Sequence, residues 1–121
     1  MTNRKIVLAE DNPTLLLLLK FKLENEGFEL FTASDGKEAM ALIENQSPDL
    51  ILTDIMMPFN DGLEVISHIR NNLKKETPVI VFSTAGQEQM VLKAFKLGAN
   101  DFMSKPFSPD ELIVRIKRFL N

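Results

Sequence analysis

The feature that most constrains the fold is an alternation, five times over, of short β-rich runs with longer helical patterns. The β-rich runs cover residues 6–9, 28–33, 49–53, 78–83 and 101–104. A helical pattern follows each run, beginning near residues 12, 35, 61, 87 and 108. Strands that alternate with helices predict right-handed βαβ crossovers and a parallel sheet covered on both faces.

Five such units favour an open, doubly wound α/β sheet of strand order 2-1-3-4-5, the flavodoxin-like (βα)5 class. The chain has 121 residues, which is enough for one core, and we expect a single domain over residues 1–121 with no output domain. The formal net charge of −3 gives no support for nucleic-acid binding.

Several kinds of site and location are excluded by composition. There is no cysteine, which excludes disulfides and thiolate chemistry. The longest unbroken apolar run, Leu15 to Leu19, is too short for a membrane span, and the N-terminus lacks the apolar region of a signal peptide. We therefore expect a cytoplasmic protein that does not contact a membrane.

Polar residues that can act as nucleophiles, ligands or hydrogen-bond donors stand at the carboxyl ends of four predicted strands. These residues are Glu10-Asp11, Asp54, Thr84 and Lys105. In the expected order the first and third strands are neighbours, so three carboxylates converge on one crevice. Two carboxylates about 5 Å apart repel by roughly 3 kcal/mol at an effective dielectric constant of about 20. The cluster therefore needs a cation, the lysine or a bound proton.

The residue types in this crevice are those required for phosphoryl transfer to a carboxylate. Carboxylate oxygens in an open site suit Mg²⁺, Lys105 can neutralise a phosphoryl oxygen, and the Thr84 hydroxyl can donate a hydrogen bond to another. Asp54 is the preferred nucleophile because it stands alone at the centre of the crevice. The adjacent acids Glu10 and Asp11 are better placed to hold the metal.

With these residues in order, the chain resembles the receiver domains of two-component response regulators over essentially its whole length. The matching segments are Glu10-Asp11, Asp54, Met57-Pro58, Asp61-Gly62, Thr84-Ala85, residues 98–102 and Lys105-Pro106. The chain departs from the family pattern in small ways, because Glu10 stands where Asp is also common and Phe59 where Gly is frequent.

The resemblance implies a role for each site residue. Asp54 would be the phosphoacceptor, and Mg²⁺ would be bound by Asp11, Asp54 and the backbone carbonyl of Met56, with Glu10 assisting. Thr84 and Phe102 would change position on phosphorylation, and the Lys105-Pro106 bond would be cis.

The resemblance also implies partners. The donor would be a phosphohistidine on a histidine kinase or a histidine phosphotransfer protein. The surface of the fourth helix, fifth strand and fifth helix would then control a downstream protein or a fused output domain. The chain would be a signalling module that assists its own phosphorylation and dephosphorylation, not an enzyme with a separate substrate.

Other interpretations are open for particular residues. Asp54 alone could be an ordinary loop acid, and Phe102 could be a fixed core aromatic. The leucine run places Leu15, Leu16, Leu19 and Leu23 on the core side of the first helix. The side chains of Leu17, Leu18 and Phe21 would either pack against the last helix or form a docking surface for a phosphodonor.

Two other classes of function compete with the signalling hypothesis. A receiver-like module that only binds partners would not need the acidic cluster. A different α/β enzyme would need a motif that this sequence lacks, such as Gly-x-Gly-x-x-Gly after the first strand or a P-loop lysine. A phosphatase of the haloacid dehalogenase type would need a second Asp where Met56 stands.

Overall fold

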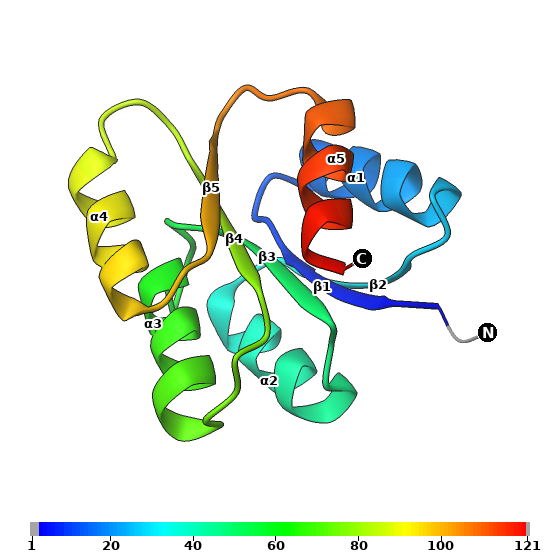
Figure 1. The fold of residues 1–121 in the computed structure, drawn as a ribbon. Helices are drawn as coiled ribbons and strands as arrows, with labels where there is room; N and C mark the ends of the chain where they lie inside the picture. Colours follow the sequence, from blue (N-terminus) through cyan, green and yellow to red (C-terminus); the bar gives the residue numbers. More distant parts are fainter. Residues whose placement is uncertain (1–2, 121) are drawn as a thin grey trace.

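The computed structural model describes residues 3–120, and within them five parallel strands form one sheet of order β2-β1-β3-β4-β5 (Figure 1). The strands are β1 (Lys5–Ala9), β2 (Glu29–Ala33), β3 (Leu50–Asp54), β4 (Val79–Ser83) and β5 (Asp101–Ser104). The helices are α1 (Pro13–Asn25), α2 (Gly36–Gln46), α3 (Gly62–Ser67), α4 (Glu88–Leu97) and α5 (Pro109–Leu120). The predicted doubly wound α/β fold is confirmed.

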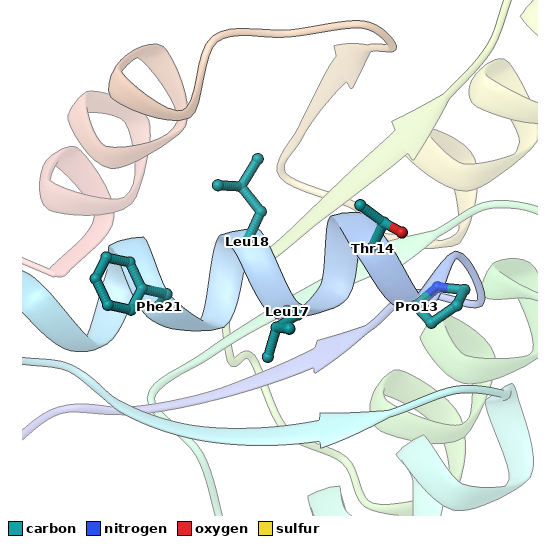
Figure 2. Close-up of a pocket in the computed structure, with 5 residues that line it drawn as sticks. All are labelled: Pro13, Thr14, Leu17, Leu18 and Phe21. Carbon is teal, nitrogen blue, oxygen red and sulfur yellow. The ribbon is translucent and has the colours of Figure 1, made fainter.

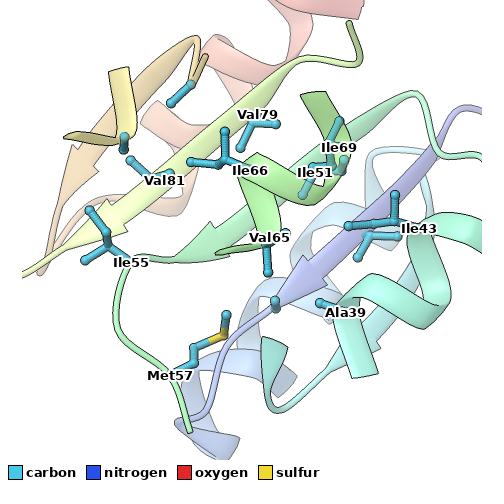
Figure 3. Packing of buried hydrophobic residues seen from close by; sticks show 14 of the residues in the cluster. Ala39, Ile43, Ile51, Ile55, Met57, Val65, Ile66, Ile69, Val79 and Val81 are labelled. Carbon is cyan, nitrogen blue, oxygen red and sulfur yellow. The ribbon is translucent and has the colours of Figure 1, made fainter. Parts of the chain in front are cut away.

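Helices cover both faces of the sheet, and each face has its own apolar core. Helices α2, α3 and α4 pack on one face, where Ile51, Val79 and Val81 point (Figure 3). Helices α1 and α5 pack on the other face, where Ile6, Leu52 and their neighbours point. Adjacent strand residues alternate between the two cores because successive side chains of a strand point to opposite faces.

Short polar side chains begin three of the helices, as their sequence predicts. The side chains of Asn12, Asp35 and Asp61 each accept a hydrogen bond from a backbone N–H in the first turn of the helix that follows. With Glu64, Asp61 forms the predicted reciprocal capping box. Helix α4 ends at Gly98, whose φ of +116° is the left-handed conformation that glycine favours.

Helix α3 differs from the prediction because it continues as a π-helix over His68–Asn72. The Leu73 N–H bonds the His68 carbonyl at 2.9 Å, which is a π-type i to i+5 hydrogen bond. The Arg70 side chain projects from this segment and donates two hydrogen bonds to the Gly98 carbonyl, from Nη2 at 2.8 Å and from Nε at 3.2 Å. This side chain joins the end of α3 to the end of α4.

The leucine-rich helix α1 buries the face that its periodicity predicts. Leu19 and Leu23 are buried in the core against α5, and Leu15 and Leu16 are partly buried beside them. In contrast, Leu17 is 69% exposed, Leu18 43% and Phe21 62%, so α5 does not cover them. No helix among residues 3–120 is long and apolar enough to cross a bilayer.

Candidate functional site

The sheet register brings four of the predicted site residues to one edge. Glu10 follows β1 and Asp54 ends the adjacent β3. Thr84 follows β4, and Lys105 follows the adjacent β5. Parallel strands have their carboxyl ends at the same edge, so the four side chains meet there. The register pairs that fix this arrangement are Ala9 with Thr53, Asp54 with Phe82, and Ser83 with Ser104.

Lys105 is in direct contact with two of the three carboxylates. Its ammonium nitrogen lies 2.6 Å from Asp54 Oδ1 and 2.7 Å from Glu10 Oε1. The Glu10 contact is close enough for an ion pair but lacks the angles of a hydrogen bond. Glu10 also accepts a hydrogen bond on Oε2 from the backbone N–H of Asn12, at 3.0 Å. The peptide bond that follows, Lys105-Pro106, is cis, as expected.

The two buried carboxylates titrate as a pair. Burial, together with the nearby Glu10 carboxylate, raises the pKa of Asp54 to about 8. For Glu10, burial acts upward on the pKa, but the close approach of Asp54 and of the Lys105 ammonium, with the Asn12 N–H, outweighs it and lowers the pKa. For Lys105, burial acts downward on the pKa, but the close contacts with the Asp54 and Glu10 carboxylates outweigh it and raise the pKa. One lysine therefore does not fully compensate the negative charge of this cluster.

The donor set fits a hard divalent cation. Glu10, Asp11 and Asp54 each offer a carboxylate oxygen, and these oxygens lie within 4.8 Å of one another. Asp54 Oδ2 is buried and has no hydrogen-bond partner among the described residues. Carboxylate oxygens are ligands that suit Mg²⁺. Asp11 is exposed, so the cluster is open to solvent on that side.

A cavity of about 150 Å³ opens over Asp54. Most of the predicted site residues line this cavity. The lining residues are Asp11, Asp54, Met56, Phe82, Ser83, Thr84, Gln87 and Lys105. Phe102 does not line it. This ring is 38% exposed, so it is not a fixed core aromatic, and it meets Phe95 edge-to-face with centroids 6.0 Å apart. A second cavity of about 320 Å³ lies between Thr84 and Phe102, and both residues line it.

Gln87 is the site residue that the sequence did not indicate. Its Oε1 accepts a hydrogen bond from the Thr84 backbone N–H at 2.7 Å, and its side chain lines the cavity over Asp54. A glutamine just before a helix carries no motif, because Gln is not a common N-cap residue.

An exposed apolar surface on α1 continues toward the site. Its members are Pro13, Thr14, Leu17, Leu18 and Phe21, which we call the α1 surface (Figure 2). A hollow of about 460 Å³ begins at Thr14 and Leu18 and reaches Thr84 and Lys105. Since Thr84 and Lys105 also line the cavity over Asp54, the α1 surface and the carboxylates lie along one continuous depression.

Comparisons with known proteins agree with this geometry. Residues 6–117 match the family model of the response regulator receiver domain. The chain is 39% identical over 118 residues to the alkaline phosphatase synthesis transcriptional regulatory protein PhoP of Bacillus subtilis. That alignment covers 98% of the chain and 49% of PhoP, so the chain spans about half the length of this relative.

Solved structures give the same result. The receiver domain of the Francisella response regulator 1452 is 36% identical with a TM-score of 0.87, over 97% of this chain and 96% of that one. A CheY-like receiver domain protein from Methanospirillum hungatei JF-1 is 28% identical with a TM-score of 0.92, over 98% and 94% of the two chains.

Proposed function

The chain belongs to the response regulator receiver domains of two-component systems, and from this we propose that Asp54 accepts a phosphoryl group from a phosphohistidine donor. The observation that carries the proposal is the contact of Lys105 with Glu10 and Asp54, beside Asp11, at the floor of an open cavity. The clustered carboxylates repel one another, which costs stability. A receiver-like module that only binds partners would not need such a cluster.

In the proposed transfer, an Asp54 carboxylate oxygen attacks the donor's phosphorus. The new O–P bond forms as the P–N bond to the imidazole breaks, and the electron pair of that bond returns to the ring nitrogen. Asp54 attacks as the ionised carboxylate, a form that a bound divalent cation would favour over the protonated one. Lys105, now 2.6 Å from Asp54 Oδ1, can then shift its contact to a phosphoryl oxygen, and the Thr84 hydroxyl can donate to another.

Glu10, Asp11, Asp54 and the Met56 carbonyl would hold Mg²⁺. When bound, the metal supplies positive charge that offsets the carboxylates and the phosphoryl oxygens. By this account the chain assists its own phosphorylation and dephosphorylation and has no separate substrate.

The response to phosphorylation would run from Thr84 to the surface of α4, β5 and α5. If Thr84 moves toward the phosphoryl group, Phe102 can turn from its exposed position into the cavity of about 320 Å³ that it shares with Thr84. The change of surface would control a downstream protein or an output domain. Two states that differ by a few kcal/mol suffice for such a switch.

The phosphodonor would dock on the α1 surface. Exposed Leu17, Leu18 and Phe21 offer an apolar helix face, and the depression beside them leads to Asp54. An apolar helix of a histidine kinase or histidine phosphotransfer protein suits such a face, with its phosphohistidine directed into the depression.

Intact-mass spectrometry after incubation with acetyl phosphate tests the proposed function. With Mg²⁺ we expect one labile phosphoryl group per chain, and little or none with EDTA. Asp54→Asn should remove the adduct and leave the fold intact by circular dichroism. Full labelling of that variant would overturn the assignment.

A further inference from the structure

The loop between β4 and α4 is held by side chains from the start of the helix that follows it. Gln87 Oε1 accepts from the Thr84 N–H at 2.7 Å, and Glu88 Oε1 accepts from the Gly86 N–H at 3.3 Å. Gly86, with φ of +92°, allows the chain to turn back over so few residues. The loop that carries Thr84 is therefore fastened to the first turn of α4.

Gln87 occupies the N-cap position of α4 without capping it. In α1, α2 and α3 the N-cap side chain accepts a backbone N–H of its own helix, whereas no such bond is made by Gln87 within residues 3–120. Its amide oxygen is directed backward to Thr84 instead. A cap side chain normally satisfies the first N–H groups of its helix, so this arrangement serves the loop rather than the helix.

Thr84 lines two cavities, and the hydrogen bond that its backbone N–H donates to Gln87 fixes its backbone beside both. One is the cavity of about 150 Å³ over Asp54, which Gln87 also lines. The other is the cavity of about 320 Å³ that Thr84 shares with Phe102. Because Gln87 Oε1 bonds the Thr84 backbone N–H at 2.7 Å, a displacement of the Thr84 backbone relative to the start of α4 would stretch or break that hydrogen bond.

We propose that Gln87 is a positioning residue of the switch, whose amide oxygen retains Thr84 in the resting position until phosphorylation breaks the hydrogen bond. This inference rests on the proposed function, since it requires that Thr84 moves. One such hydrogen bond is worth a change of about 2- to 10-fold in an equilibrium constant. Loss of the bond therefore raises the population of the active conformation by that factor before any phosphoryl group is present.

The test compares Gln87→Ala with Gln89→Ala and with Gln87→Glu. Gln89 is the same residue type two positions further along α4, exposed to solvent, so its change controls for loss of a side chain in this turn. Gln87→Glu retains an oxygen acceptor for the Thr84 N–H. Amide chemical shifts of residues 84–104 are recorded for each protein with Mg²⁺, before and after addition of beryllofluoride, a phosphoryl mimic.

Free Gln87→Ala should shift toward the spectrum of mimic-bound wild type, and its apparent affinity for beryllofluoride should rise about 2- to 10-fold. Gln89→Ala and free Gln87→Glu should remain at the wild-type resting spectrum. Unchanged spectra and affinity in Gln87→Ala would overturn the inference, as would a weaker affinity, which would mean that Gln87 contacts the phosphoryl group. A wild type that does not respond to the mimic would overturn the proposed function itself.

Discussion

The chemistry of Asp54 follows from its burial together with the charges that surround it. Its side chain lies at the floor of the cavity, in contact with the ammonium of Lys105, which also touches Glu10. Two acids share one lysine, and Asp11 adds a third carboxylate nearby. The remaining negative charge is satisfied by a proton at low pH, and a divalent cation would satisfy it in the working protein.

The raised pKa of Asp54 predicts how stability depends on pH without metal. The folded carboxyl, with a pKa of about 8, keeps a proton that the unfolded carboxyl, at 3.8, has lost. The free energy of unfolding should therefore fall as pH rises from about 5 to 8, by at most about 1.4 kcal/mol per pH unit. Glu10 and Lys105 add little slope in this window, because the folded pKa of Glu10 lies below 4.5 and that of Lys105 lies above 10.5.

Urea denaturation in EDTA at several pH values measures this dependence. Asp54→Asn should remove the slope and exceed the wild type in stability at pH 8, since it removes a buried negative charge. The quantity to compare is the difference in free energy of unfolding between the wild type and this variant. If that difference is the same at pH 8 as at pH 5, Asp54 does not titrate in the window.

The three acids should contribute unequally to metal affinity. Asp11 is exposed, whereas Glu10 is fully buried and already contacts Lys105 and the Asn12 N–H. Asp11→Ala should therefore weaken Mg²⁺ binding at least about tenfold, which is 1.4 kcal/mol, and more than Glu10→Gln does. Calorimetric or fluorescence titration measures both, with Asp110→Ala on α5 as a remote control. The reverse order would mean that Glu10 is the direct ligand.

At the scale of elements, α1 carries more apolar surface than the sheet can cover. Five consecutive leucines face every direction around a helix, so some must point to solvent. Exposed leucine and phenylalanine side chains in one patch beside a reactive site are typical of a docking surface.

Replacement of exposed residues on the α1 surface should slow transfer from a protein donor but not from a small molecule. Leu17→Ser or Phe21→Ser should reduce the rate from a phosphohistidine-bearing protein about tenfold or more, the cost of an interface anchor. Labelling by acetyl phosphate should be unchanged, because neither side chain lines the cavity over Asp54. Val114→Ser on α5, 59% exposed, is the matched control. Equal slowing with both donors would contradict a docking role.

At the scale of the whole molecule, the fold was predictable because each element carries a local signal. Apolar runs gave the strands, acid–Glu pairs gave helix starts, and Gly98 gave the end of α4. The convergence of Glu10, Asp54 and Lys105 then followed from strand order, since parallel strands end at one edge.

Features that depend on tertiary contacts were not predictable. The π-helix at the end of α3 accompanies contacts of Arg70 with α4, a partner distant in sequence. The hydrogen bond from Thr84 to Gln87 depends on a backbone turn at Gly86. Periodicity separated the core face of α1 from its outer face, but it did not say whether α5 would cover Leu17 and Phe21.

The most direct test of the central claim is chemical mapping of the phosphorylated residue. Borohydride reduces an aspartyl phosphate to homoserine, and tandem mass spectrometry of a digest then locates the product in the sequence. After phosphorylation with Mg²⁺ we predict homoserine at position 54, in proportion to the phosphoryl group lost. Reduction at Asp11 or at any other acid, or a phosphorylated chain in which position 54 remains aspartate, would contradict the account.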